Sequence, residues 1–275
     1  SHVGCRARTP VTGLYADPHL YDILHQPGTD REARVLLRLF RRFASGAPEV
    51  ALEPACGSGR YVCALARLGL RARGFDLSPA MVRYARARSD AGGLASFFVA
   101  SFESFAARVR AGSIGLAFCP INSVRHVRSD REMVRHLRAV RDVMHPCGVY
   151  VVGLSLSAYG LEAPSEDVWT ATRREGASRV RVRQVVSYTP APGGRGRGRQ
   201  ELVHSVLEIT RGRRVEVRGS SYTLHAFSRA QWEGVVRRAG LRLIASVDEA
   251  GRDHDPGLLG YAQFVLARRD HPLAG

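Results

Sequence analysis

Apolar positions recur with a helical period in the first part of the chain and fall into short runs after it. Residues 14–45 predict two helices, because apolar side chains repeat near every 3.6 residues and a Gly-Ala-Pro break at 46–48 ends the second helix. The next apolar run, 50–52, predicts a short strand that leads through a glycine turn into a helix at 60–68. The first unit of the fold is therefore strand, tight turn and helix.

The same alternation of strand and helix continues past the middle of the chain. Ser78 and Ser129 are good N-caps for the helices that follow them, and Glu132 predicts a capping box with Ser129. The second of these helices is predicted to include Met144 and to stop at Pro146. Apolar strands that alternate with helices are typical of a parallel sheet covered by helices. The strands are predicted at 71–75, 96–100, 113–119 and 149–156.

Residues 157–227 follow a different pattern. The segment 179–183 alternates arginine and valine, and parts of 202–209 and 215–224 also have a period of two, which predicts half-exposed antiparallel strands. Between them, 190–199 is rich in proline, glycine and arginine; such a tract can contact RNA, but one short copy between two strands favours a flexible hairpin tip. A helix from the capping box of Ser228 and Gln231 to Ala239, and strands at 241–247 and 258–267, are predicted to follow.

The net charge of the 275 residues is +16, a value that can signal nucleic-acid binding. All 41 lysine-plus-arginine positions are arginine, which indicates biased codon usage more than selection for phosphate contacts. The arginines are also spread along the chain, and residues 157–227 hold 12 of them against 7 acidic residues. We therefore do not expect nucleic acid to be the partner.

Neither a membrane span nor a disulfide framework is expected. No window approaches about 18 consecutive apolar residues, and Ser1–Thr9 lacks the apolar core of a signal peptide, so the cytoplasm is the simplest compartment. The number of cysteines is odd and no C-x-x-C pair occurs, so we expect reduced thiols and no metal site. The cysteines are Cys5, Cys56, Cys63, Cys119 and Cys147.

The candidate chemistry begins at the first turn, which reads LEPACGSGR over residues 52–60. A glycine turn at the carboxyl end of a strand lets the backbone approach a nucleotide-like ligand closely. A P-loop would need Gly-Lys-Ser/Thr, and a dinucleotide fingerprint would need a third glycine where Val62 stands. Glu53 precedes the turn, and Asp76 ends the next strand, 17 residues after Gly59, where an acid accepts hydrogen bonds from ribose hydroxyls.

These features resemble the class I S-adenosylmethionine-dependent methyltransferases. The matching stretches are LEPACGSGR at 52–60, GFDLSPAMVRYAR at 74–86 and CPINS at 119–123, and the resemblance covers about residues 14–156 and 228–268. It implies a Rossmann-like α/β fold with a seven-stranded, mostly parallel sheet and helices on both faces. It also implies S-adenosylmethionine as the cofactor and S-adenosylhomocysteine as the product.

The family pattern gives most residues around the turn a role. Glu53 would hold the methionine end of the cofactor, and Asp76 would bind the ribose hydroxyls. Many members have a Gly-Asp-Met-like run whose aspartate meets the adenine amine; here Ser101 is expected to substitute for it and Phe102 to pack on the ring. The implied cofactor set, with Leu77 and Met81 against the adenine, is Tyr15, Glu53, Ala55, Gly57, Gly59, Arg60, Asp76, Leu77, Met81, Ser101, Phe102, Cys119 and Asn122.

Methyl transfer itself demands little of the side chains. The sulfonium is already a good leaving group, so the enzyme must align a nucleophile with the S–CH3 bond and exclude water. An amine must arrive neutral, whereas a hydroxyl usually needs a base or a metal. The catalytic candidates are Tyr21, in the segment that folds over the cofactor in similar enzymes, His126 after the fourth strand, and His225 on the inserted strands, where His204 also lies.

The overall layout resembles the small-molecule methyltransferases, especially glycine/sarcosine and amino-sugar N-methyltransferases, which share the Y-x-x-x-x-x-Y-D start and an antiparallel insertion. We expect a methyltransferase domain of residues 1–156 and 228–275, with 157–227 as a substrate lid. The expected reaction is in-line SN2 methyl transfer to a small-molecule metabolite, with N favoured over O. An RNA methyltransferase and a non-catalytic cofactor-binding protein stay open as alternatives, and similar enzymes often form homodimers.

Overall fold

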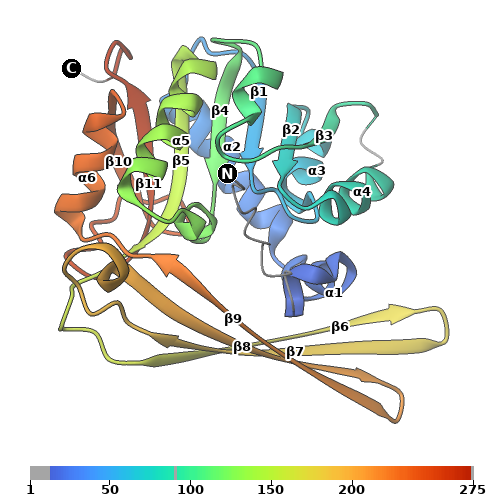
Figure 1. Cartoon of the computed structure of the whole chain (residues 1–275). Coiled ribbons are helices and arrows are strands. Elements are labelled where there is room, and N and C mark those ends of the chain that lie inside the picture. Colours follow the sequence, from blue (N-terminus) through green and yellow to red (C-terminus); the bar gives the residue numbers. More distant parts are fainter. Residues whose placement is uncertain (1–12, 90–91, 274–275) are drawn as a thin grey trace, which may run out of the picture.

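The computed structural model describes residues 13–89 and 92–273, so Cys5 lies outside the described part. Seven strands form sheet A in the order β3-β2-β1-β4-β5-β11-β10 (Figure 1). Strands β1 to β5 pair in parallel, and β11 pairs antiparallel with both β5 and β10. This confirms the predicted α/β fold with a mostly parallel sheet. Its strands are β1 (Val50–Pro54), β2 (Arg71–Asp76), β3 (Ala95–Val99), β4 (Ile114–Cys119), β5 (Met144–Leu156), β10 (Leu241–Val247) and β11 (Gly260–Arg268).

Helices cover both faces of sheet A. One face carries α2 (Thr29–Phe43), α3 (Arg60–Arg67) and α4 (Pro79–Arg88), and the other carries α5 (Asp130–Val143) and α6 (Arg229–Arg238). Residues of the central strands enter two separate apolar cores, which explains why these strands are continuous apolar runs. Among the described helices, none has the length and apolar character that a membrane span requires. The short 3-10 helices are η1 (Gly13–Ala16), η2 (Phe105–Arg108), η3 (Ser123–His126) and η4 (Gly196–Arg199).

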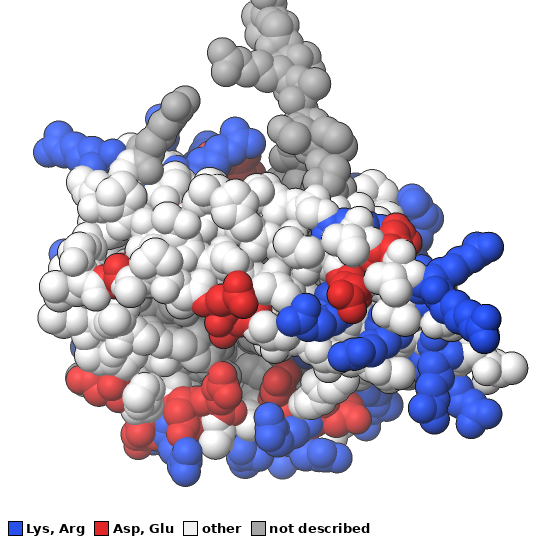
Figure 2. Space-filling view, turned by 90° about the horizontal axis from the view of Figure 1, so that it is seen from below, with Lys and Arg blue, Asp and Glu red and all other residues white. Residues whose placement is uncertain are grey.

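The inserted segment forms a second sheet, sheet B, of four antiparallel strands in chain order. Its inner face packs on η1 and α1 (Pro18–His25), which lie between the two sheets (Figure 1). Much of its outer face is uncharged, and arginines gather over the β6–β7 and β8–β9 turns (Figure 2). The strands are β6 (Ser165–Glu175), β7 (Ser178–Thr189), β8 (Gln200–Arg211) and β9 (Arg214–His225). The inner contact buries Leu14, Leu20, Ile23 and Leu24 against Val180, Val182, Leu207 and Ile209.

The helix starts follow the sequence signals with one difference. Ser228 and Gln231 form the predicted capping box: the serine hydroxyl accepts the Gln231 N–H (3.3 Å), and the Gln231 side chain accepts the Ser228 N–H (2.9 Å). The Ser129 hydroxyl likewise accepts the Glu132 N–H (3.2 Å). The Glu132 carboxylate, however, accepts from the N–H of Arg128 (2.8 Å), so the reciprocal half of the predicted box is wrong. The carboxylate still satisfies a backbone donor at the start of the helix.

The predicted end of the following helix is also wrong. Helix α5 ends at Val143, and Met144 already belongs to β5, where it pairs with Ile114. Pro146 therefore lies inside the strand and does not stop the helix. The β4–β5 ladder shifts register in this region, and a residue without an N–H donor is tolerated at such an irregularity.

The arginine- and glycine-rich tract at 190–199 is anchored at its end. It joins β7 to β8, and the last residue of η4, Arg199, is only 8% exposed. The Arg199 guanidinium pairs with Asp130 at the start of α5 (2.7 Å) and donates to the Ala226 carbonyl (2.8 Å). The expected flexible tip thus contains an arginine that holds sheet B to sheet A.

Candidate active site

The turn between β1 and α3 presents backbone at the edge of sheet A. Ala55, Gly57 and Gly59 have φ angles of 54°, 53° and 74°. Glycine adopts these left-handed conformations freely, whereas a side chain makes them costly. A Cβ atom at Gly59 would also lie 2.5 Å from the Phe97 ring. Both conformation and space therefore require glycine at this position.

Asp76, at the carboxyl end of β2, joins this turn to α4. Its Oδ2 accepts the N–H of Gly57 (2.9 Å), and its Oδ1 accepts the N–H of Ser78 (2.8 Å). Burial raises the pKa of this carboxyl, and the backbone donors oppose that shift. The carboxylate is half-buried and keeps lone pairs for further donors. Beside it, Leu77 is 49% exposed and Met81 is buried.

Glu53 brings an unpaired carboxylate oxygen to the same place. The residue is 4% exposed, and its Oε2 has no hydrogen-bond partner in the structure. Burial raises its pKa, and the nearby Arg60 lowers it. The Arg60 guanidinium itself donates to Thr29 (2.8 Å), Glu32 (3.2 Å) and the Tyr61 hydroxyl (2.8 Å). Arg60 is therefore engaged with α2, and a direct contact to the cofactor stays a prediction.

Four aromatic rings from distant parts of the chain meet near the turn. The ring centroid of Tyr15 lies 5.9 Å from Tyr21, 5.9 Å from His126 and 5.6 Å from Tyr222 on β9. The Tyr21 ring lies directly against the turn, because a Cβ at Gly57 would be 3.2 Å from its Cε1 atom. We call Tyr15, Tyr21, His126 and Tyr222 the ring cluster. The structure thus brings three predicted site residues together and adds Tyr222.

The ring cluster is reached by water but walled by protein. The three tyrosines are half-buried and His126 is exposed. Burial nevertheless raises the pKa values of Tyr15, Tyr21 and Tyr222. Although His126 is exposed, the protein atoms around its imidazole remove part of its hydration and lower its pKa to about 4, and the neighbouring Arg125 adds to this shift. At neutral pH the cluster therefore offers hydrogen-bonding groups and no charge.

Ser101 and Phe102 follow β3 at the same edge of the sheet. The Ser101 hydroxyl lies 3.1 Å from the Ser104 hydroxyl and accepts the Glu103 N–H (3.3 Å), so it stabilises its own turn. The Phe102 ring lies 4.3 Å from the His136 ring, between centroids, and packs on the core under α5. Both residues are half-buried, and their contacts with adenine stay predictions.

Cys119 is the last residue of β4, and Asn122 lies three residues later in the turn after the strand. Their surroundings differ. Cys119 is fully buried, and burial raises the pKa of its thiol. The Asn122 side chain accepts the Ser155 N–H (2.7 Å) and donates to the Ser155 hydroxyl (3.0 Å). Asn122, with a φ of 59°, therefore ties the turn after β4 to β5.

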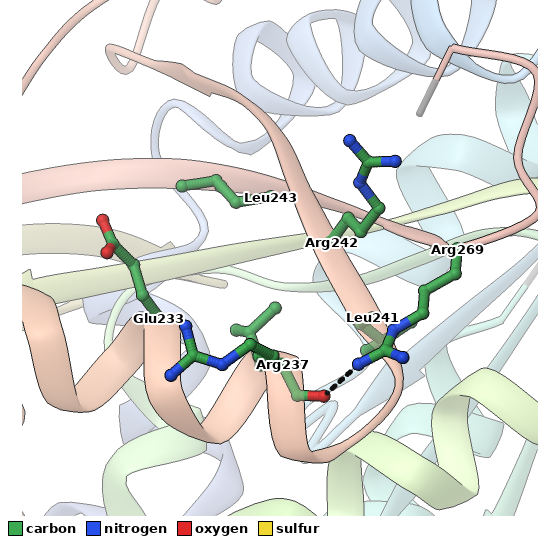
Figure 3. A pocket seen from close by; sticks show the side chains of 7 residues that line it. Glu233, Arg237, Leu241, Arg242, Leu243 and Arg269 are labelled. Carbon is green, nitrogen blue, oxygen red and sulfur yellow. Dashed lines mark hydrogen bonds between the residues drawn. The ribbon is translucent and has the colours of Figure 1, made fainter. Parts of the chain in front are cut away.

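A surface depression of about 450 Å³ lies away from these residues, at the outer edge of sheet A (Figure 3). Side chains of α6 and β10 line it, and Arg269 donates to the Arg237 carbonyl beside it (3.1 Å). None of the candidate site residues lines this depression. Across residues 13–89 and 92–273, no group of three or more His, Cys, Asp or Glu side chains is placed to hold a metal ion.

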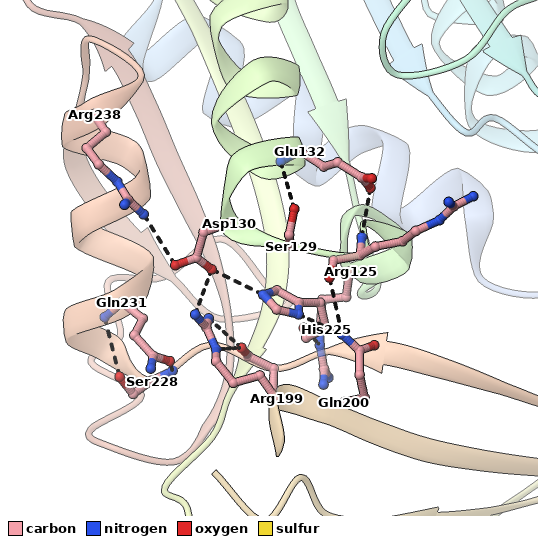
Figure 4. Close-up of polar contacts among 12 residues, drawn as sticks. Arg125, Ser129, Asp130, Glu132, Arg199, Gln200, His225, Ser228, Gln231 and Arg238 are labelled. Carbon is pink, nitrogen blue, oxygen red and sulfur yellow. Dashed lines mark hydrogen bonds and ion pairs between the residues drawn. The ribbon is translucent and has the colours of Figure 1, made fainter. Parts of the chain in front are cut away.

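His225 belongs to a polar network with Asp130 and Gln200 (Figure 4). It is 3% exposed, and its two ring nitrogens lie 3.1 Å from Asp130 and 2.9 Å from the side-chain amide of Gln200. Arg125 donates to its carbonyl (3.0 Å), and Arg199 shares the Asp130 carboxylate. With both nitrogens engaged, His225 anchors sheet B to α5 in this network.

Two residues of the site were missed from the sequence. Tyr222 has a signal, because period-two alternation places it on the same face of β9 as the buried Leu224. Asp22 also has a signal, because it is the last residue of the Y-x-x-x-x-x-Y-D start. Its contacts have none, because the partners of its buried carboxylate come from the turn, α4 and β6, which only the tertiary fold brings together.

The strand order of sheet A, with a glycine turn after β1 and an acid after β2, defines the class I methyltransferase fold. In agreement, residues 51–148 match a family model described as a methyltransferase domain. Residues 51–148 thus belong to a methyltransferase domain. No match is found among the curated proteins.

Solved structures similar to this chain include S-adenosylmethionine-dependent methyltransferases. The sugar N-methyltransferase KedS8 from a Streptoalloteichus species is 18% identical, with 98% of this chain and 99% of that chain covered and a TM-score of 0.69. The amino pentose methyltransferase CalS10 from Micromonospora echinaspora, solved with S-adenosylmethionine, is 20% identical, with 96% and 100% covered and a TM-score of 0.66. The CcbJ methyltransferase from Streptomyces caelestis is 21% identical, with 88% and 96% covered and a TM-score of 0.65. At these low identities, the TM-scores show a common fold and nothing further.

Proposed function

We propose that this protein transfers the methyl group of S-adenosylmethionine to an amine of a small molecule, with amino sugars as the acceptor class. The observation that carries the proposal is the uncharged ring cluster beside the glycine turn. Tyr15, His126 and Tyr222 lie within 6 Å of one another, measured between ring centroids. On this proposal, the acceptor binds beside these three rings.

The residues around the turn fit this cofactor. The buried Oε2 of Glu53 lacks a partner, and the ammonium group of the amino-acid half would satisfy it. Asp76 stands where an acid can accept two hydrogen bonds from ribose hydroxyls. Gly57 and Gly59 hold the turn in a left-handed conformation. The space that a Cβ would take is filled by the Tyr21 ring at Gly57 and by the Phe97 ring at Gly59, so the cofactor would approach the turn from another side. When bound, the cofactor supplies a methyl group on a cationic sulfur, and the neutral thioether that remains is a good leaving group.

The ionisation of the ring cluster favours an amine over an alcohol as the acceptor. An efficient general base has a pKa near the working pH. The tyrosine hydroxyls ionise above their usual range, and His126 has a pKa of about 4, so no group within the ring cluster suits removal of an alcohol proton. A neutral amine brings its own lone pair and needs orientation, which hydroxyl and imidazole groups provide. The released proton passes to water, which reaches His126.

The walls of the site support an amino sugar. Aromatic surfaces with a few converging polar groups are typical of small-molecule pockets. Two of the similar structures are described as a sugar N-methyltransferase and an amino pentose methyltransferase. We propose that residues 157–227 act as the lid over this acceptor, because sheet B contributes Tyr222 to the ring cluster.

A labelled-methyl assay with two matched acceptors tests the proposal. The acceptors are an amino sugar and the same sugar with a hydroxyl in place of the amine. We expect label in the amine compound, and a rate that falls as acid protonates the amine. His126→Ala should lower kcat/KM by about tenfold through the lost hydrogen bond. The matched control, His204→Ala, changes an exposed histidine bonded to Ser221 and should keep full activity.

Two outcomes would contradict the proposal. Equal labelling of the hydroxyl compound would show that the site activates alcohols. Label found only in added RNA, with retention on filters that decreases as salt rises, would favour the RNA alternative.

A further inference from the structure

Asp22 of α1 has a buried carboxylate that three other parts of the chain share. The residue is 2% exposed. Its Oδ1 accepts the Ser58 hydroxyl from the glycine turn (3.0 Å) and a hydrogen bond from Arg88 on α4. Its Oδ2 accepts the Tyr84 hydroxyl of α4 (3.2 Å) and Nη2 of Arg173 on β6 (2.9 Å). One side chain therefore joins α1, the turn, α4 and sheet B.

The charges around Asp22 show which of these contacts can be removed alone. A buried carboxylate is costly unless it is paired and hydrogen-bonded. Arg88 and Arg173 both compensate it, and their side chains are 22% and 30% exposed. Loss of Arg173 leaves Asp22 paired with Arg88. Loss of Asp22, in contrast, leaves two partly buried guanidinium groups without their common counter-charge.

Through Ser58, Asp22 also contacts the glycine turn of the proposed cofactor site. Ser58 is fully buried and lies between the two glycines of the turn. Gly57, next to it, gives its N–H to Asp76 (2.9 Å). Tyr21 precedes Asp22 in α1, and its ring covers the turn at Gly57. Helix α1 therefore covers the glycine turn through Tyr21 and also binds it, through the hydrogen bond between Asp22 and Ser58.

We propose that Asp22 is a positioning residue through which sheet B sets the affinity of the glycine turn for the cofactor. The inference rests on the proposed function, because it concerns the same cofactor site. Sheet B reaches the carboxylate through Arg173, whose Nη2 also donates to the Asp22 carbonyl (3.2 Å). The guanidinium fixes Asp22, which fixes the Ser58 hydroxyl and with it the N–H of Gly57 (Figure 1 shows α1 between the sheets). An acceptor that holds sheet B in place would strengthen cofactor binding, and the coupling is reciprocal.

Cofactor affinity in the absence of an acceptor tests this coupling. The variants are Arg173→Met, Ser58→Ala and the two combined, in the whole chain. Titration calorimetry with S-adenosylhomocysteine gives each Kd, and thermal unfolding without ligand gives the stability. We expect Arg173→Met to weaken binding by about tenfold, since it removes a hydrogen bond between charged groups. The matched control, Arg174→Met, alters the next residue of β6, which is exposed and donates to the Gly176 carbonyl (3.3 Å); its Kd should equal that of the wild type.

The combined variant separates a positioning role from a purely structural one. If Arg173 acts through Asp22 and Ser58, adding Ser58→Ala to Arg173→Met weakens binding by no more than about a further twofold. Fully additive losses would overturn the inference. So would an Arg173→Met protein that binds normally and only unfolds at a lower temperature. A wild-type protein that does not bind S-adenosylhomocysteine would contradict the proposed function instead.

Discussion

Replacing Asp76 by alanine separates the proposed ribose contact from the contacts made within the protein. The carboxylate accepts the N–H groups of Gly57 (2.9 Å) and Ser78 (2.8 Å), and ribose would add two hydroxyl donors. Hydrogen bonds to a charged group contribute about 1.5–3 kcal/mol each, so loss of two ligand bonds weakens binding by about 3–6 kcal/mol, roughly 10²–10⁴-fold. Because Asp76 is only half-buried, we expect the lower value, about 100-fold.

Titration calorimetry with S-adenosylhomocysteine measures this loss, and an analogue that lacks both ribose hydroxyls assigns it. The wild type should bind the analogue more weakly than S-adenosylhomocysteine. Asp76→Ala should bind the two ligands within about twofold of each other, since the residue that distinguishes them is gone. The matched control is Asp142→Ala, which removes an exposed carboxylate near the end of α5 and should bind as the wild type does.

The result that would refute this reasoning is an equal loss for both ligands. If Asp76→Ala weakens S-adenosylhomocysteine and the dideoxy analogue by the same factor, the carboxylate acts only on the turn, through Gly57 and Ser78. The ribose assignment would then be wrong.

Two further predictions concern stability and assembly. His136 is fully buried, with its Nε2 2.9 Å from the Tyr150 hydroxyl, and burial lowers its pKa from 6.5 to about 3. Between these pH values the unfolded chain binds the proton and the folded chain does not. The free energy of unfolding therefore decreases by about 1.4 kcal/mol for each pH unit by which the pH is lowered. Between pH 6.5 and 5, the wild type should lose about 2 kcal/mol more unfolding free energy in urea than His136→Gln does, and equal losses would contradict this. On sheet B, Val206 is 47% exposed in a row of valines on the outer face, and Arg183 on β7 lies opposite Glu208 on β8 in the next row. A two-fold axis parallel to the strands would bring Arg183 of one copy opposite Glu208 of a second copy. We therefore expect a homodimer in light scattering, and we expect Val206→Arg to convert it to a monomer. A monomeric wild type would refute this prediction.

The main features of the fold were predictable because their signals are local. The apolar run 50–52 and the period-two segment 179–183 identify their strands without knowledge of neighbours. The capping box at Ser228 likewise depends on residues within one turn of helix. At the site, Gly57 and Asp76 stand at the carboxyl ends of adjacent parallel strands, so strand order alone predicts that they meet.

The remaining features depend on contacts between distant segments. Met144 joins β5 because it pairs with Ile114, which no helical period within 129–145 reveals. Arg199 is buried because Asp130 lies across the interface with α5, so a composition that looks flexible becomes an anchor. His225 is a catalytic candidate by its place on the inserted strands alone, and the partners of its two ring nitrogens, Gln200 and Asp130, are known only from the tertiary fold.

A crystal structure with S-adenosylhomocysteine is the most direct test of the central claim, that one cofactor lies between the glycine turn and the ring cluster. The account predicts ribose hydroxyls within hydrogen-bond distance of Asp76, the amino-acid half beside Glu53, and the sulfur facing Tyr15 and His126. A ligand bound elsewhere, or a turn that stays covered by Tyr21 with no ligand at saturating concentration, would contradict it.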